Sequence, residues 1–417
     1  MKLLVFAHVP PPHHGQSYMV KLMLDGFGGD RREKSAGAKP GGFGIECYHV
    51  NARFSKTIED IGEFQGWKIL LIFFYCLQAI WCRFRYGVDN FYYVPAPGKK
   101  VALYRDWLVM FVCRRFFKRT ILHWHAAGLA KWLETSMQFR ARAMTYRLFR
   151  PVDLSIVLSR YNVADAEKLL SRRVIVVNNG IADPCPDFTE TILPLRRARF
   201  EARAKLLAGE QPAPAETEGA GGNPRMIKVL FLAHCTREKG LFDAMEGVVA
   251  ANRQLAARQS PARMKLHVAG SFTTADEKNE FDRMMQKPEF ASAVKHFGFV
   301  SGDEKCRLLR EADLFCFPTH YLGENQPVNL IEAMAFGLPI VTTRWRSLPE
   351  ILPPDYPGLV DTQSPAQIAG LLLRVAAMDL AVPLRETFLR RFTIEQHLAG
   401  MAAAIRSVED SSSSSSS

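Results

Sequence analysis

Short apolar runs that alternate with amphipathic helical patterns restrict the fold of this chain more than any other feature. The runs lie at residues 3–9, 90–95, 120–125, 154–158, 173–177, 228–233, 265–269, 294–297, 314–317 and 339–343. Parallel strands need a crossover, usually a helix, to join them, so this alternation predicts parallel sheets covered by helices. The fold class is therefore expected to be α/β.

A change of composition divides the strand-like runs into two sets. Residues 191–225 are charged, then rich in Ala, Pro, Glu and Gly, with no apolar periodicity. Such a segment is typical of a linker or a surface insertion. We therefore expect two domains, at residues 1–190 and 226–389. A last helix is predicted at about 390–408, and the serine-rich end, 409–417, is expected to be disordered.

The positive charge of the chain lies in its first half. The net charge is +12, and residues 1–185 carry 27 Lys and Arg against 14 Asp and Glu. This asymmetry predicts an anionic partner, such as membrane headgroups or a phosphorylated substrate. No recognised nucleic-acid motif accompanies the charge, so no nucleic acid is expected. The eight cysteines include no Cys-x-x-Cys pair, which argues against a zinc site and for a reduced, cytoplasmic protein.

An apolar run and a basic stretch in the first half together suggest a membrane surface. Residues 69–82 contain no charge but fall short of the roughly 20 apolar residues of a bilayer span. They predict a buried or interfacial helix. Residues 99–150 hold 12 basic and 2 acidic side chains, interleaved with aromatic residues. We expect peripheral contact with anionic lipid at the inner face of the plasma membrane; a solvated basic face over ordinary core helices is the alternative.

The segment 320–339 carries the densest set of candidate site residues. It follows the apolar run 314–317 and opens a helix, with Pro327 expected as the first helical residue because its missing N–H costs nothing there. The amides of Val328 and Asn329 would then point out of the helix N-terminus. Such an end attracts anions, so the sequence predicts a diphosphate site.

Two glutamates frame this predicted site. Glu324 and Glu332, separated by seven residues and followed by Ala-Met-Ala-Phe-Gly-Leu-Pro, resemble the signature of the retaining GT-B glycosyltransferases, family 4 (group 1) type. Further similar stretches lie at 178–181, 231–240, 296–300, 312–318 and 349–352. The resemblance implies two Rossmann-like, doubly wound parallel-sheet domains that face a central cleft. It also implies that the second domain binds a nucleotide sugar, and that the first binds the acceptor and receives the last helix.

The resemblance also implies roles for single residues. Glu332 would hold the nucleotide ribose, Glu324 the donor sugar, and Lys239 would neutralise the departing diphosphate. His234 stands where the family commonly has arginine; Arg237 could replace that cation, or the phosphate clamp is weaker, and the sequence leaves this open. The other donor-binding candidates in the second domain are Asn325, Pro327, Val328 and Asn329. The predicted catalytic residues are His125, Glu324 and Lys239.

Two candidates lie in the first domain. Gly15 occupies the position of the family's glycine-rich loop, where a glycine lets the backbone approach the donor phosphate; a plain strand-to-helix turn is the alternative. His125 ends a strand, and the resemblance implies that it lies near the reacting sugar. We prefer it to His123, which we expect on the opposite face of the strand; for either histidine a hydrogen-bonded structural role is the alternative. No further group of His, Asp or Glu residues completes His123-Trp124-His125 as a metal site, so no metal is expected.

The resemblance implies that the protein is a glycosyltransferase of the hexosyltransferase type. It would move a sugar from a UDP- or GDP-linked donor to a glycan or lipid-linked acceptor in cell-surface polysaccharide or glycolipid biosynthesis. No cofactor is expected, because the nucleotide sugar is a substrate. Two alternatives stay open: a catalytically weak, membrane-associated scaffold, which the departure at His234 favours, and a nucleotide-sugar epimerase, which would need paired acid and base side chains.

Overall fold

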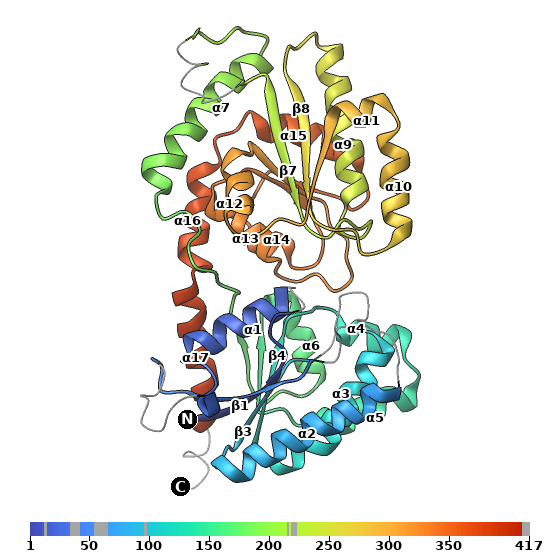
Figure 1. The fold of residues 1–417 in the computed structure, drawn as a ribbon, viewed down its shortest axis with the longest axis vertical. Helices are drawn as coiled ribbons and strands as arrows, with labels where there is room; N and C mark the ends of the chain where they lie inside the picture. Colours follow the sequence, from blue (N-terminus) through green and yellow to red (C-terminus); the bar gives the residue numbers. More distant parts are fainter. Residues whose placement is uncertain are drawn as a thin grey trace. The chain divides into compact units, whose positions relative to one another are not determined.

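The chain divides into two compact units. The computed structural model describes residues 1–11, 15–33, 42–53, 66–95, 98–214, 217 and 223–410. The first unit consists of residues 1–180 and 394–417, and the second of residues 181–393. In each unit helices flank a central sheet (Figure 1). The boundary therefore lies at residue 180, before the segment that composition marked as a linker.

The described part of the first unit contains a parallel sheet of six strands. Their spatial order is β2 (Glu46–Asn51), β1 (Lys2–Ala7), β3 (Asn90–Tyr93), β4 (Arg119–Trp124), β5 (Leu154–Val157) and β6 (Val174–Val176). The chain moves from β1 to one side and then returns to place β3 on the other. The carboxyl ends of β1 and β3 therefore flank a topological switch point, where α/β sheets bind ligands.

Helices cover both faces of this sheet. They are α1 (Gly15–Gly26), α2 (Gly66–Tyr86), α3 (Lys100–Cys113), α4 (Leu129–Ser136), α5 (Phe139–Phe149), α6 (Val163–Lys168) and α17 (Ile394–Asp410). Successive side chains of β1 serve opposite faces: Leu3 and Val5 pack into a core shared with α1 and α17, Leu4 and Phe6 into one shared with α2, α3 and α5. Burial on both faces explains why the strand is apolar throughout.

The second unit carries a parallel sheet with a different order. Among its described residues the six strands follow the order β12 (Leu359–Val360), β11 (Ile340–Thr343), β10 (Leu314–Phe317), β7 (Met226–Leu232), β8 (Arg263–Ala269) and β9 (Val294–Gly298). Numbered from its own first strand, this is the 3-2-1-4-5-6 order of doubly wound nucleotide-binding domains. The switch point lies between β7 and β10, and the loops after these two strands carry most of the predicted site residues.

The helices of the second unit include one that the sequence analysis assigned to a linker. They are α7 (Leu193–Leu207), α9 (Leu241–Ala257), α10 (Ala275–Met285), α11 (Pro288–Ala293), α12 (Gly302–Glu311), α13 (Val328–Ala335), α14 (Leu348–Ile351), α15 (Pro365–Ala376) and α16 (Ala381–Arg391). Residues 193–207 thus form α7, whereas 215–216 and 218–222, in the same predicted linker, lie outside the described residues.

Buried arginines explain why α7 showed no apolar periodicity. Arg196 donates to three backbone carbonyl oxygens, of Leu309, Ala312 and Phe336, at 2.6–2.9 Å. Arg203 donates to the carbonyl of Ala376 and forms an ion pair with Asp313, with Nη1 and Oδ1 3.1 Å apart. Guanidinium groups with several donors can thus fix a helix that has few apolar contacts. Hydropathy patterns do not detect this kind of packing.

The last helix, α17, belongs to the first unit. Met401, Ala402 and Ile405 on α17 are buried in the core that contains β1 and α1. Glu409 and Asp410 still belong to the helix, and residues 411–417 of the expected tail lie outside the described residues.

Candidate active site

The loops after β7 and β10 meet at the switch point of the second unit. The backbone N–H of His320 donates to the carbonyl of Glu238 over 2.8 Å. Gly240 has φ +82° and a Cβ placed there would lie 2.3 Å from the carbonyl oxygen of Pro318. Only glycine combines this backbone conformation with so close an approach. The two loops are therefore in contact through their backbones.

This contact brings together Lys239 and Glu324, which are 85 residues apart in the chain. Lys239 Nζ lies 2.7 Å from Glu324 Oε2, and the side chains are only 19% and 8% exposed. Thr319, fully buried, places its hydroxyl 3.0 Å from the same carboxylate oxygen. The ring centroid of Tyr321 lies 4.6 Å from the ammonium, and burial, with a further contribution from Glu324, raises the Tyr321 pKa. Sequence analysis missed Thr319 and Tyr321, although both lie within five residues of Glu324.

Helix α13 begins at this site. Pro327 has ψ 128° and is the N-cap, so the helix starts at Val328, one residue later than expected. No described side chain forms a cap hydrogen bond at this end. Asn329 Nδ2 donates to the carbonyl of Leu232 over 2.7 Å, which ties α13 to the end of β7. The N-terminal amides of α13 are thereby fixed next to the switch point, in the arrangement that favours an anion.

The second glutamate of the motif also pairs with a lysine. Glu332 lies in α13, and its Oε1 is 2.5 Å from Nζ of Lys305 on α12. The sequence contains no signal for this partner, because it lies in another helix. Asn325 is buried on the loop before α13, and Ser347 Oγ donates to its Oδ1 over 3.1 Å.

The two residues considered for the second cation differ in their surroundings. Burial, and then the charge of Lys239, lowers the pKa of His234, so this imidazole is neutral at pH 7. Arg237 forms an ion pair with Glu280 on α10, and its backbone N–H donates to Glu277 over 2.9 Å. The guanidinium of Arg237 is thus engaged by α10. In this arrangement neither residue adds a cation beside Lys239.

His123, within β4, and His125, directly after it, lie on the same side of the strand. Their ring centroids are 4.1 Å apart, so the expectation that His123 faces away from His125 is wrong: residues two apart share a face. Depth distinguishes them instead. His123 is buried, with Nδ1 2.5 Å from Tyr92 Oη, and burial, helped by His125 and His397, lowers its pKa well below the usual range. His125 follows β4 at its carboxyl end and is half-buried.

Gly15 is the first residue of α1. A Cβ placed there would meet no atom within 4 Å, and Gly15 is not among the glycines with positive φ. The described backbone therefore does not by itself require glycine at this turn. Residues 12–14 of the same predicted loop lie outside the described residues.

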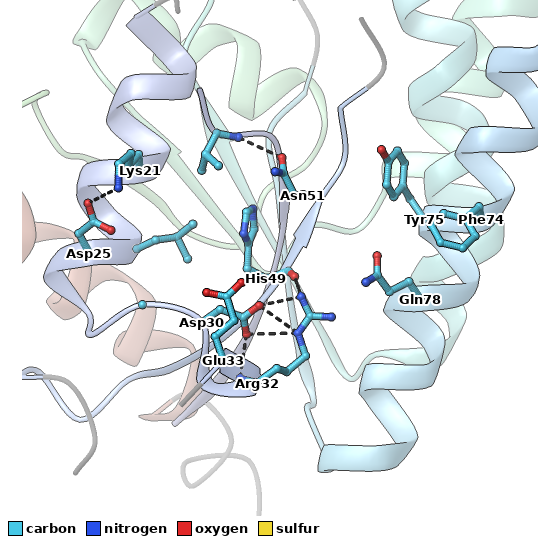
Figure 2. A pocket seen from close by; sticks show the side chains of 13 residues that line it. Lys21, Asp25, Asp30, Arg32, Glu33, His49, Asn51, Phe74, Tyr75 and Gln78 are labelled. Atoms are coloured by element: carbon cyan, nitrogen blue, oxygen red, sulfur yellow. Dashed lines mark hydrogen bonds and ion pairs between the residues drawn. The ribbon is translucent and has the colours of Figure 1, made fainter. Parts of the chain in front are cut away.

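A cavity of about 460 Å³ lies at the edge of the first sheet, next to β2 (Figure 2). Ion pairs Lys21–Asp25 and Arg32–Asp30 line it, with shortest distances of 2.8 and 2.7 Å. His49 projects toward it from β2, while Phe74, Tyr75 and Gln78 approach from α2. Sequence analysis did not identify this cavity. Its charged and amide groups could bind the hydroxyl groups of a polar ligand.

The part of the chain that the structure describes contains no candidate metal site. No group of three or more His, Cys, Asp or Glu residues there could hold an ion. All eight cysteines fall within the described ranges and are free thiols.

Comparison with known proteins relates the part of the chain that contains this site to a known family. Residues 218–388 match the model of the glycosyl transferases group 1. The amylovoran biosynthesis glycosyltransferase AmsK of Erwinia amylovora is 30% identical over 155 residues, 36% of each chain. The putative colanic acid biosynthesis glycosyltransferase WcaL of Escherichia coli K12 is 28% identical over 157 residues, 37% of this chain and 36% of WcaL. The matched region thus spans little more than a third of these relatives' length.

Solved structures resemble nearly the whole chain. Sucrose-phosphate synthase from Thermosynechococcus elongatus has a TM-score of 0.64 at 15% identity and covers 99% of this chain and 100% of its own. Anabaena HepE, solved in complex with UDP and glucose, has a TM-score of 0.63 at 15% identity, with coverage of 98% and 100%. At these identities the likeness shows the fold. The chain has the GT-B fold of these structures, with two six-stranded parallel sheets in its described residues, and its residues 218–388 match the glycosyl transferases group 1.

Proposed function

We propose that this protein is a retaining glycosyltransferase that transfers a hexosyl group from a nucleotide sugar to a glycan or lipid-linked acceptor. The observation that carries the proposal is the Lys239–Glu324 pair beside the N-terminus of α13, at the switch point of a nucleotide-binding fold. HepE binds UDP and UDP-glucose in its solved complexes, which supports a UDP-linked donor. The names of AmsK and WcaL refer to amylovoran and colanic acid biosynthesis, which supports a polysaccharide product.

The diphosphate of the donor is proposed to occupy the N-terminus of α13. The amides of Val328 and Asn329 would donate to its oxygens, and the Lys239 ammonium would neutralise its charge. In the reaction the bond between the anomeric carbon and the diphosphate oxygen breaks, and the nucleoside diphosphate leaves with the electron pair. Stabilisation of that charge by Lys239 and the helix lowers the barrier. The acceptor hydroxyl then attacks from the face that the diphosphate leaves and passes its proton to an oxygen of the departing diphosphate, which retains the anomeric configuration.

The two glutamates are proposed to hold the two sugars of the donor. Glu332 would accept hydrogen bonds from the ribose, in place of its ion pair with Lys305. Glu324 would accept from hydroxyl groups of the transferred hexose once Lys239 turns to the diphosphate. Thr319 keeps its hydrogen bond with Glu324 throughout, so the carboxylate stays oriented while its partner changes.

The acceptor is proposed to bind in the first unit. His125 stands at the carboxyl end of β4, where an α/β sheet presents side chains to ligands, and the cavity beside β2 offers charged and amide groups for hydroxyl recognition.

One observation favours the alternative of a weak or inactive scaffold. Because His234 is neutral, the phosphate clamp carries less positive charge than a clamp with arginine at that position.

Nucleotide binding by the purified protein tests the proposal. A thermal-shift screen against UDP, GDP, ADP and their sugars, with and without EDTA, should show a metal-independent rise with one nucleotide. A ligand at 100 times its Kd adds about 2.7 kcal/mol to the free energy of unfolding. Glu332→Gln should weaken this nucleotide about 10- to 150-fold, the value of hydrogen bonds to a charged group. The exposed Glu304→Gln on α12 is the charge-matched control.

Glu324→Gln separates transfer from binding. It should retain the nucleotide-induced shift and lose transfer of radiolabelled sugar from the nucleotide sugar that binds. A scaffold would show no transfer in the unmodified protein, and absence of a shift with every nucleotide would refute the transferase proposal.

A further inference from the structure

Helix α2 of the first unit has two apolar faces. One face is buried in the core of the unit and consists of Ile72, Cys76, Ala79 and Cys82. The opposite face is exposed and consists of Leu70, Phe73, Phe74, Leu77, Trp81 and Phe84. At about 100° per residue these six positions form a single stripe along the helix. The exposed fractions range from 41% at Phe73 to 74% at Leu70, so the stripe faces solvent.

Neighbouring helices expose further large apolar side chains. Helix α2 packs against α3, and α3 against α5, and the three lie together beside one face of the sheet (Figure 1). Tyr104 and Phe111 on α3 and Phe139 on α5 are 50%, 59% and 75% exposed. We call these residues, with the α2 stripe, the apolar face. Large exposed apolar patches mark interaction sites.

The charges around the apolar face are basic. Exposed Lys100, Arg85, Arg115 and Arg147 lie on or directly after its three helices, and residues 99–150 contain 12 basic and 2 acidic side chains. The guanidinium of Arg115 lies 4.7 Å from the ring centroid of Phe111, so charge and apolar surface adjoin. Aromatic side chains bordered by arginine and lysine match the boundary between anionic headgroups and acyl chains.

The buried side of α2 determines which part of the helix can contact a bilayer. The helix has 21 residues, about 31 Å at 1.5 Å per residue, and its segment Ile69–Tyr86 has the length and mean hydropathy, 1.3, of a membrane span. However, Ile72, Cys76, Ala79 and Cys82 hold α2 against the sheet along this length. A helix that packs on its own domain in this way is available to lipid on one side only.

We propose that the first unit binds an anionic bilayer through the apolar face, with α2 lying in the plane of the membrane. Leu70, Leu77 and Trp81 enter the region between headgroups and acyl chains, while the surrounding arginines and lysines contact the phosphates. This inference concerns attachment alone and does not depend on the proposed transfer reaction.

Flotation of the full-length protein with vesicles tests the proposal. The vesicles contain phosphatidylcholine with 30% phosphatidylglycerol, or phosphatidylcholine alone. We expect binding to the anionic vesicles, a blue shift of tryptophan fluorescence that Trp81→Tyr removes, and weaker binding as NaCl rises from about 0.1 to 0.5 M. The double variant Leu70→Ser, Leu77→Ser should bind about tenfold or more weakly. Phe299→Ser with Leu389→Ser, exposed apolar positions of the second unit, is the matched control and should bind normally.

Three results would overturn the proposal. The first is failure of the unmodified protein to float with anionic vesicles, or equal flotation of the Leu70→Ser, Leu77→Ser variant. The second is a dimer in sedimentation velocity that this variant converts to a monomer without any vesicle binding, since the apolar face would then join two copies. The third is resistance of the membrane-bound protein to extraction with alkaline carbonate, since α2 would then span the bilayer. Nucleotide-induced thermal shifts of the double variant report separately on the second unit.

Discussion

Removal of the Thr319 hydroxyl should both destabilise the second unit and disturb the proposed donor site. The hydroxyl is fully buried, 3.0 Å from Glu324 Oε2 and 3.2 Å from the carbonyl of Glu238, and it accepts from the N–H of Tyr321 at 3.2 Å. Thr319→Val keeps the shape and opens no cavity. The loss is therefore polar: a hydrogen bond to a charged group, worth about 1.5–3 kcal/mol, and an amide left without its acceptor, worth about 1 kcal/mol.

These contributions give about 3 kcal/mol of lost stability. For a unit of this size that is about 6–12 °C in Tm. Urea unfolding followed by tryptophan fluorescence measures it, and Trp345 reports on the same loop because its Nε1 donates to the carbonyl of Tyr321 over 2.9 Å. Thr319→Ser retains the hydroxyl and is the matched control. The KM for the nucleotide sugar should rise in Thr319→Val, because Glu324 loses the group that orients it.

The reverse ranking would refute this reasoning. If Thr319→Ser were less stable than Thr319→Val, the methyl group and not the hydroxyl would carry the contribution of this side chain. If Thr319→Val lost stability with an unchanged KM, the hydroxyl would support the fold without orienting Glu324.

Three further predictions concern backbone strain, pH and buried arginine. Gly240→Ala should lower the free energy of unfolding by about 2 kcal/mol and weaken nucleotide binding, because φ is +82° and the new Cβ would meet Pro318. Gly370→Ala in α15, which has open space around it, is the control and should change neither property. Thermal melts compare the stability of the two variants. Burial lowers the pKa of His397 to about 4, below about 6.5 in the unfolded chain. The unfolded state therefore takes up the extra proton, and stability present above pH 6.5 falls as pH drops toward 4, by up to about 3 kcal/mol. His397→Asn should flatten that part of the stability curve of the first unit in urea titrations at each pH; an unchanged slope would contradict the assignment. Arg196→Met should lower the free energy of unfolding by about 3 kcal/mol or more, because it leaves three carbonyl groups without their donor. Urea unfolding measures the change. A variant as stable as the parent would show that other groups donate to these carbonyls.

Local sequence patterns determined most of the secondary structure near the site. The strand predicted at 314–317 is β10, and Glu324 and Glu332 stand on the loop and the helix expected for them. Such features depend on the periodicity and capping of one element, which neighbouring residues in the chain decide. The same local information placed Pro327 one position too far into the helix, because an N-cap and a first helical residue differ only in ψ.

Patterns within one element were misleading where burial depended on other elements. Residues 193–207 looked like a linker because Arg196 and Arg203 fix α7 through carbonyl groups, which hydropathy does not register. His123 and His125 share a face of β4, and only their depth, set by Tyr92 and the surrounding core, separates them. An apolar run likewise could not show that α2 has one buried and one exposed side.

The sequence by itself determined the alternation of strands and helices, the family motif and the positions of its two glutamates. The tertiary structure alone decided that Lys239 meets Glu324, that Lys305 meets Glu332, and that Arg237 turns to α10. The physical reason is that the strand order brings together loops and helices that are distant in the chain. The ion pairs between them join residues whose spacing in the sequence does not indicate that they are in contact. Local geometry fixes each element, and packing between elements fixes the site.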